Sequence, residues 1–150
     1  MRFRAATEAD LSAIVALLAD DPLGRGREGG PAAAYLAAFR AIEASPALHL
    51  IVGEREGAVV ATYQLAILPG LASRGMTRAL LESVRVAAPL RSQGVGAQLV
   101  ADAIDRARAE GARVLELFTH KSRTRAHAFY ERLGFTPSHI GYKRELTSGG

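Results

Sequence analysis

The sequence contains no cysteine, which excludes disulfide bonds and thiol catalysis. It also lacks a long hydrophobic run. The longest uncharged stretch, residues 57–73, is interrupted by Gln64 and Pro69 and is too short to cross a membrane as a helix. No apolar leader opens the chain, because Glu8 and Asp10 come too early for a signal peptide. These absences predict a cytoplasmic protein with no membrane partner.

Lysine is scarce, with two lysines beside 17 arginines, and the formal net charge is +4. A basic balance can indicate nucleic-acid binding. Here the arginines are interleaved with acids, as in residues 54–56 and 106–110, so we expect no nucleic acid and attribute part of the charge to an anionic ligand. His120, His127 and His139 have no cysteine or carboxylate at ligand spacing, so we also expect no metal.

The spacing of apolar residues predicts a single α/β domain over residues 1–150. Its order is β-α-α-β-β-β-α-β-α-β. Strands are expected at residues 2–5, 48–54, 58–68, 77–87, 114–119 and 138–146, and helices at 7–19, from Pro31, from Val95 to a stop at Gly111, and over the motif at 126–135. The hairpins imply antiparallel pairing and the strand–helix–strand after Thr77 implies a parallel pair, which together predict a central mixed sheet flanked by helices.

The most informative segment is the turn from Arg91 to Gly96, which follows a strand and opens a helix. The first N–H groups of a helix have no partners within it, and the dipole makes that end positive, so it attracts phosphate. Glycine lets the backbone approach the anion. The spacing fits neither a Walker loop nor a dinucleotide fingerprint. The turn is therefore either an ordinary β–α turn or a site for a phosphate-bearing ligand held mostly by main chain.

A second motif spans residues 126–135, after a strand and at the start of a helix. Ala126, Phe129, Tyr130 and Leu133 recur at helical spacing and share one face. A core face closed by a glycine explains the three apolar residues. It explains Tyr130 only in part, because a buried hydroxyl needs a partner.

Arg91-x-x-Gly94-x-Gly96 and the segment from Ala126 to Phe135 resemble two motifs of the GNAT superfamily, the acyl-CoA-dependent N-acetyltransferases. The resemblance extends over residues 77–146. It implies one GNAT domain in which two parallel strands splay apart around the pantetheine arm of acetyl-CoA, while the turn cradles the pyrophosphate. It further implies transfer of an acetyl group from acetyl-CoA, as co-substrate, to a primary amine by direct attack.

The resemblance also implies roles for individual residues. A backbone N–H near Val86 would stabilise the oxyanion, and Tyr130 would protonate the leaving thiolate as general acid, unless it only packs against the sulfur. Arg123 stands where the family often has an asparagine that binds the pantetheine arm, with Ser122 as a substitute. The cofactor-binding residues expected on this basis are Val84, Val86, Arg91, Ser92, Gln93, Gly94, Val95, Gly96, Ser122 and Arg123.

Glu82 is a candidate general base, since the attacking amine must lose a proton. Alternation along a strand would put Glu82, Val84 and Val86 on one face. A carboxylate within an apolar strand is costly unless it is paired. A structural ion pair with Arg78 or Arg85 is therefore the favoured alternative to a catalytic role.

The acceptor is less determined by the sequence. In the family the first two helices and their loop line the acceptor site, so Asp20 and Asp21 could hold a cationic amine, although a solvated loop is the commoner case. The expected partner is a small-molecule amine. Protein N-termini or lysines, or a non-catalytic acyl-CoA-binding or regulatory module, are alternatives. The loop Pro69–Gly75 is a candidate for the acceptor site or for a homodimer contact.

Overall fold

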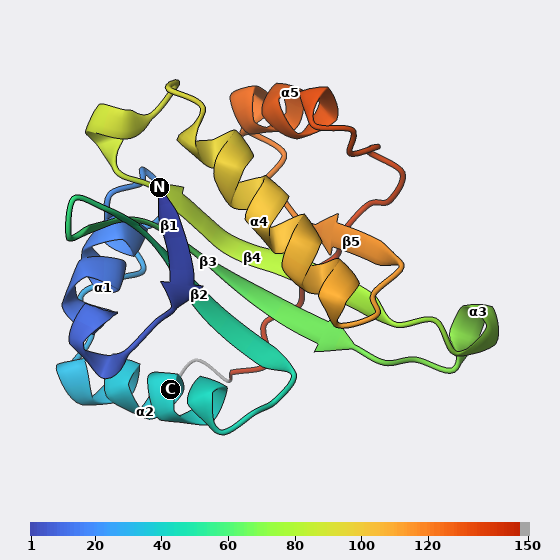
Figure 1. Ribbon diagram of the computed structural model, residues 1–150, viewed down its shortest axis with the longest axis horizontal. Coiled ribbons are helices and arrows are strands. Elements are labelled where there is room, and N and C mark those ends of the chain that lie inside the picture. The colour runs from blue at the N-terminus through green and yellow to red at the C-terminus, as the bar shows by residue number, and fades with distance from the viewer. Residues whose placement is uncertain (148–150) are drawn as a thin grey trace. The chain divides into compact units, whose positions relative to one another are not determined.

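The computed structural model describes residues 1–147 and divides the chain into two compact units, Met1–Leu117 and a smaller unit that begins at Phe118 (Figure 1). Among these residues, no helix combines the length and the apolar character needed to cross a membrane.

The larger unit is built on one five-stranded sheet whose strands lie in sequence order. The strands are β1 (Arg2–Ala5), β2 (Leu48–Arg55), β3 (Ala58–Leu68), β4 (Arg78–Val86) and β5 (Val114–Leu117). The first four pair antiparallel and β5 pairs parallel with β4. Glu56 and Gly57 join β2 to β3 with φ values of 52° and 79°, the left-handed conformations that suit a two-residue hairpin turn. The predicted mixed sheet is thus confirmed.

Helices and short turns connect the strands. They are η1 (Glu8–Asp10), α1 (Leu11–Ala19), α2 (Ala32–Glu43), α3 (Ala72–Gly75), η2 (Ala88–Leu90) and α4 (Val95–Ala109). The α4 helix ends at Ala109, and the predicted stop, Gly111, follows two residues later with a left-handed φ of 80°. The expected loop from Pro69 to Gly75 contains α3, in which Ser73 and Arg74 have left-handed φ values of 52° and 64°.

The two faces of the sheet carry different helices. Tyr63, in β3, faces α4, because its hydroxyl donates to Asp102 Oδ2 of that helix at 2.5 Å. The neighbouring residues Thr62 and Gln64 lie on the opposite face, where they line a cavity beneath α1 and α2. Figure 1 shows α4 crossing its face of the sheet. We call the two sides the α4 face and the α1 face.

A β-bulge interrupts β4 at its middle. Thr62 pairs with Arg85 and Gln64 pairs with Glu82, so two residues of β4, Ser83 and Val84, stand opposite one of β3. Ser83 has a left-handed φ of 52°. The bulge shifts the alternation of side chains that follow it.

The shift overturns one prediction. Glu82, opposite Gln64, lies on the α1 face, whereas Val86, opposite Ala61, lies on the α4 face. The expectation that Glu82, Val84 and Val86 share a face is wrong, because it assumed a regular strand.

The parallel pairing ends just before this bulge. The last pair between β4 and β5 joins Leu81 to Leu117, and β4 continues to Val86 without β5 beside it. Strand β5 was expected to run to Thr119 but ends at Leu117. The parallel pairing of β4 with β5 therefore covers only the first part of β4.

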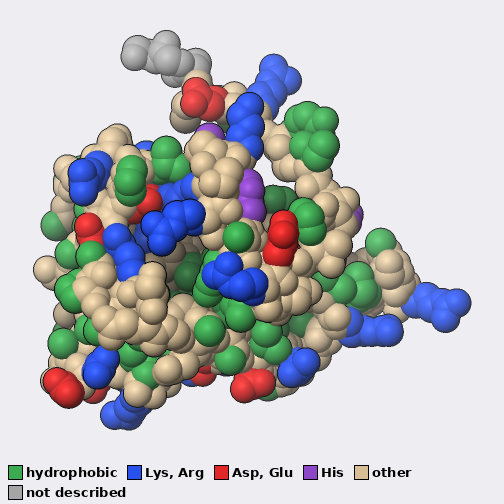
Figure 2. All heavy atoms as spheres, turned by 90° about the horizontal axis from the view of Figure 1, so that it is seen from above, with side chains coloured by type: hydrophobic (Ala, Val, Ile, Leu, Met, Phe, Trp, Pro, Cys, Tyr) green, Lys and Arg blue, Asp and Glu red, His purple; other side chains and the backbone are tan. Residues whose placement is uncertain are grey.

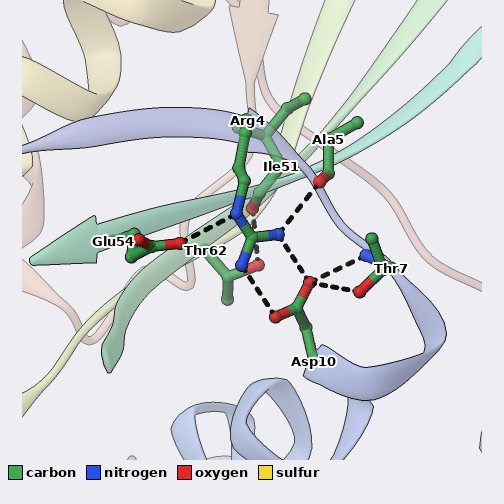
Figure 3. A network of polar contacts seen from close by, with 7 residues as sticks. All are labelled: Arg4, Ala5, Thr7, Asp10, Ile51, Glu54 and Thr62. Carbon is green, nitrogen blue, oxygen red and sulfur yellow. Dashed lines mark hydrogen bonds and ion pairs between the residues drawn. The ribbon is translucent and has the colours of Figure 1, made fainter. Parts of the chain in front are cut away.

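An ionic network fastens the start of α1 to the α1 face of the sheet (Figure 3). Arg4 donates from both terminal nitrogens to Asp10 at 2.7 and 3.0 Å, and from Nε to Glu54 at 2.9 Å. Asp10 Oδ2 also accepts from the backbone N–H of Thr7 at 2.8 Å. The Arg4 hydrogen bonds, with those from Thr7, lower the pKa of Asp10 to about 2.

The smaller unit contains α5 (Thr124–Arg132) and no strand within its described part. The predicted last strand, residues 138–146, is therefore wrong. Ile140, Tyr142 and Leu146 alternate as in a strand but are 80%, 92% and 90% exposed. Alternation describes one face of a strand and supplies no neighbouring edge, and a strand without a ladder is not stable by itself.

Candidate active site

The site in the larger unit begins at the end of β4. The N–H of Ala87 donates to the carbonyl of Val60 at 2.8 Å, so these two residues form a hydrogen-bonded pair of the antiparallel ladder. Val86 and Ala61, one step back, form the non-hydrogen-bonded pair. The backbone N–H of Val86 therefore points away from β3, toward the side of β4 on which β5 no longer pairs.

A turn with two left-handed residues follows. Ser92 has a φ of 62° and Gly94, the N-cap of α4, has a φ of 80°. A Cβ added at Gly94 would meet no atom within 4 Å, so glycine is needed here for its backbone conformation and not for space. The side chain of Gln93 stays within the turn, where Nε2 donates to the Pro89 carbonyl at 2.6 Å.

Within residues 1–147, no side chain caps the first turn of α4. The N–H of Gln98 bonds the Gly94 carbonyl at 3.1 Å, which places Val95, Gly96 and Ala97 before the first internal hydrogen bond of the helix. Gly94 has no side chain that could cap them. These N–H groups and the helix dipole together favour an anion at this end.

The side chain of Arg91 connects two elements of the site by hydrogen bonds. Its Nε donates to the Val86 carbonyl at 3.0 Å, and its Nη2 donates to the carbonyl and carboxylate of Asp20 at 2.8 and 3.0 Å. Arg91 thus ties the end of β4 to the end of α1. Sequence reasoning placed Arg91 in this turn but did not find Asp20 as its partner, since the two are far apart in the chain.

The second acid of the α1–α2 loop is also engaged. Asp21 Oδ2 accepts from the backbone N–H of Gly24 at 3.1 Å and lies 3.5 Å from Arg85 Nη2 and 3.9 Å from Arg27 Nη2. The side chain of Asp21 is only 12% exposed. This part of the loop is therefore an organised segment and not a solvated one.

Glu82 is exposed and lies on the α1 face. The two partners expected for it are taken, Arg78 by Glu116 and Arg85 by Asp21. Within residues 1–147 no ion pair or hydrogen bond of the Glu82 side chain is found, so the favoured structural pairing of Glu82 is not formed.

The second motif lies in the smaller unit. Tyr130 is half-buried, and its ring packs edge-on against Phe129 and Phe135 with centroids 5.0 and 5.6 Å apart. The Ser122 hydroxyl and His120 Nδ1 are 2.7 Å apart. Arg123 is the N-cap of α5, and its N–H donates to the His120 carbonyl at 2.9 Å. The segment from His120 to Arg123 is therefore a hydrogen-bonded turn that leads into the helix bearing Tyr130.

Charge is dispersed on the face that Figure 2 shows. Figure 2 shows blue Lys and Arg side chains distributed over one face, with red carboxylates between them. The basic groups nearest the start of α4 in the chain, Arg85 and Arg91, are both paired with aspartates of the α1–α2 loop.

Comparison with known proteins identifies the class. The acetyltransferase (GNAT) family model matches residues 12–135. An aminoalkylphosphonate N-acetyltransferase from Salmonella typhimurium (strain LT2) is 34% identical over 113 residues, which cover 75% of this chain and 73% of that protein. The chain therefore belongs to the GNAT acetyltransferase family and is an acyltransferase.

Solved structures share the fold over nearly the whole chain. A protein from Bacillus halodurans C-125 described as a transcriptional regulator is 40% identical, with a TM-score of 0.93 over 97% of this chain and 99% of that one. A candidate acetyltransferase from Agrobacterium tumefaciens str. C58 is 30% identical, with a TM-score of 0.84 over 97% of this chain and 100% of that one.

Proposed function

We propose that this enzyme transfers an acetyl group from acetyl-CoA to the primary amine of a small molecule. The observation that carries the proposal is the arrangement around the end of β4. There the Val86 N–H points toward the edge of β4 along which β5 is no longer paired. The backbone N–H groups at the start of α4, which no side chain caps within residues 1–147, follow after one short turn. The Val86 N–H can thus donate a hydrogen bond to a carbonyl oxygen, and the N–H groups of α4, a few residues further on, can bind a diphosphate.

In this proposal the turn from Arg91 to Gly96 holds the pyrophosphate of CoA through main-chain N–H groups, and the main chain of Val84 and Val86 lies along the thioester arm. Ser122 and Arg123, at the start of α5, add polar contacts to the same cofactor. The side chain of Arg91 acts on the site by holding β4 and α1 together.

The reaction is a direct displacement. The amine nitrogen attacks the thioester carbonyl carbon, the Val86 N–H stabilises the oxyanion, and the C–S bond breaks as Tyr130 donates its phenolic proton to sulfur. An alkylamine has a pKa of about 10.4, so presenting it neutral at pH 7 costs about 4–5 kcal/mol. Glu82, which is exposed and without an ion pair within residues 1–147, takes the amine proton through water.

Among small amines, aminoalkylphosphonates are a second candidate, which the curated relative favours. Arg85 is the cation that a phosphonate would meet on the α1 face. Its side chain is 16% exposed and lies 3.5 Å from Asp21, so a phosphonate would compete with that carboxylate.

Cofactor binding is tested by calorimetry with CoA on two glycine variants. Gly94 and Gly111 stand at opposite ends of α4, both have a φ of 80°, and neither has an atom within 4 Å of an added Cβ. Valine therefore strains both positions alike. We expect Gly94→Val to abolish the binding heat and Gly111→Val to retain it. Equal CoA affinity in the two variants would contradict a phosphate cradle at this turn.

Catalysis is tested by thiol release from acetyl-CoA with alkylamines, an aminoalkylphosphonate and a lysine peptide. We expect transfer to a small amine, and Tyr130→Phe should lower turnover by about 10²–10⁴ with CoA affinity nearly intact. An unchanged rate would remove Tyr130 from the mechanism. Transfer to the peptide alone would favour a protein acceptor, and CoA binding without turnover on any amine would favour a regulatory module.

A further inference from the structure

A cavity of about 160 Å³ lies between α1, α2 and the sheet. We infer that it holds a compact apolar group of the acceptor, so that the preferred substrates are arylalkyl or branched alkyl primary amines. This inference rests on the proposed function and specifies its substrate class.

The walls of the cavity are apolar. Side chains of α1 and α2 form them, among them Leu18, Ala38 and Phe39, while Gln64 and Ser83 belong to the sheet at its floor. No charged side chain of the described residues lines it. A site of this composition favours an uncharged hydrocarbon group. It disfavours a phosphonate or a polycation, because its lining has no side chain of opposite charge to pair with either.

The polar groups of the lining fall into two kinds. The Thr62 hydroxyl is satisfied by the Ile51 carbonyl at 2.8 Å, as Figure 3 shows, and the Tyr35 hydroxyl donates to Glu28 at 2.5 Å. Within residues 1–147, the side chains of Gln64 and Ser83 make no hydrogen bond. They are therefore available to orient a ligand that enters the cavity, as the few polar groups of a binding pocket commonly do.

The cavity is linked to the proposed reaction through β4. Ser83 is part of the bulge and precedes Val86 by three residues, which span about 10 Å of strand. The strand that forms part of the cavity floor therefore ends at the N–H assigned to the oxyanion. An apolar group seated over Ser83 leaves its amine, on a short alkyl spacer, within reach of that end of the strand.

The size of the cavity sets the size of the group. An apolar cavity of about 150 Å³ in another protein accommodates benzene. A phenyl ring or a branched chain of similar volume would thus fill this one, and larger bodies such as a multi-ring sugar would not enter it.

The substrate class is tested with ethylamine, butylamine, 2-phenylethylamine, 2-aminoethylphosphonate and glucosamine as acceptors. We expect kcat/KM to rise about fourfold for each buried methylene and to be greatest for 2-phenylethylamine. Comparable kcat/KM for 2-aminoethylphosphonate or glucosamine would overturn the inference.

A pair of variants ties this preference to the cavity. Ala37 and Ala38 are both exposed and neighbouring on the same helix, but Ala38 lines the cavity and Ala37 does not. We expect Ala38→Phe to lower kcat/KM for 2-phenylethylamine by about 10-fold or more and to leave ethylamine nearly unchanged, with no effect of Ala37→Phe. If Ala38→Phe lowers the melting temperature sharply, Leu18→Ala serves instead. It enlarges the cavity and should shift the preference to longer amines.

A measurement without turnover separates this inference from the proposed function. Benzyl alcohol carries the ring but no amine, and its binding is followed by saturation-transfer NMR in the absence of CoA. We expect binding to the parent protein and to Ala37→Phe, and loss of binding in Ala38→Phe. Absence of binding to the parent protein overturns the inference. Binding to the cavity with no CoA affinity and no transfer would contradict the proposed function instead.

Discussion

The two faces of the sheet are packed in different ways. On the α4 face, Tyr63, Leu65 and Leu99 are all 0% exposed, and the polar atom at its edge, the Tyr63 hydroxyl, is bonded to Asp102. On the α1 face a cavity remains between the helices and the sheet, and Gln64 and Leu50 at its floor are only half-buried. The first face is sealed, whereas the second keeps space that a ligand could enter.

The difference follows from how each helix is held. The α4 helix lies on the sheet through a continuous apolar stripe that includes Leu99, Val100 and Ala103. The α1 helix buries the apolar residues Ile14 and Leu17 and is in addition tied at its ends, by Asp10 to Arg4 at 2.7 Å and by Asp20 to Arg91 at 3.0 Å. These ion pairs hold α1 beside the cavity that remains on the α1 face, so this face can contain a site.

The largest expected difference between the faces concerns core truncation. Leu99→Ala removes a fully buried side chain and should lower the free energy of unfolding by about 3–5 kcal/mol. Leu18→Ala, beside the existing cavity and half-buried, should cost about 1–2 kcal/mol. Urea denaturation of the two variants measures both values. Equal losses would mean that the α1 face is packed as tightly as the α4 face.

The next effect concerns the anchor at the start of α1. The pKa of Asp10 is about 2 in the folded protein against about 3.9 in an unfolded chain, so folding favours its carboxylate. The stabilisation is present above pH 4 and is lost as the pH falls from 4 to 2. Asp10→Asn should therefore cost about 2 kcal/mol at pH 7 and little at pH 2.

Glu8→Gln is the matched control for this anchor. Glu8 also pairs with an arginine, Arg40, at 2.8 Å, but the two side chains are 55% and 60% exposed. An exposed pair contributes about 0–1 kcal/mol, so this variant should change little at either pH. A loss as large as that of Asp10→Asn would show that burial of the carboxylate is not what matters.

Sequence patterns predicted the α4 helix and the turn that precedes it, because both depend on residues that are close in the chain. The period of Val95, Leu99 and Ala103 predicted α4. On the same helix Asp102 and Arg106, four residues apart, form an ion pair with 2.8 Å between Oδ2 and Nε. Gly94, just before this helix, has a left-handed φ of 80°, which glycine adopts without steric cost. Each of these features depends on residues within a few positions of one another.

The other features depend on distant parts of the chain, and the sequence did not reveal them. The bulge at Ser83 is a shift in the register between β4 and β3, and no residue type within β4 indicates it. The partners of Arg91 and Arg85 lie in the α1–α2 loop, more than sixty residues earlier. The cavity arises from the spacing between helices, which apolar periodicity does not encode. Much of the proposed acceptor side was therefore beyond reach from the sequence.

A third prediction concerns the polar atom at the edge of the sealed face. Burial, together with the hydrogen bond to Asp102, raises the pKa of Tyr63 above its ordinary value. The folded state therefore holds this proton more tightly than the unfolded chain, and the stabilisation present below about pH 10 is lost as the pH rises further. The advantage of the parent protein over Tyr63→Phe should be about 1 kcal/mol at pH 8. It should shrink by about 1 kcal/mol between pH 9 and pH 11. A constant difference across this range, measured by urea denaturation, would show that Tyr63 does not titrate differently in the two states.

The smallest expected effect on stability concerns the anchor at the end of α1. Arg91 and Asp20 are 47% and 44% exposed, so Arg91→Gln should lower the free energy of unfolding by about 0.5 kcal/mol. The Arg91→Gln variant is more informative when its affinity for CoA is measured. Because the guanidinium is turned toward Asp20 and the Val86 carbonyl, CoA affinity should change by less than about threefold, equivalent to about 0.65 kcal/mol.

Calorimetry with CoA on Arg91→Gln at low and high salt distinguishes two roles of Arg91. The side chain either links β4 to α1 or binds a phosphate of CoA directly. Direct contact with a phosphate would lower the affinity far more, and the loss would be greatest at low salt, where charge pairs are least screened. That outcome would mean that Arg91 releases Asp20 when CoA binds. The end of α1 would then lose its ion pair with Arg91 when CoA binds. The cavity beneath α1 would differ between the free and the CoA-bound enzyme.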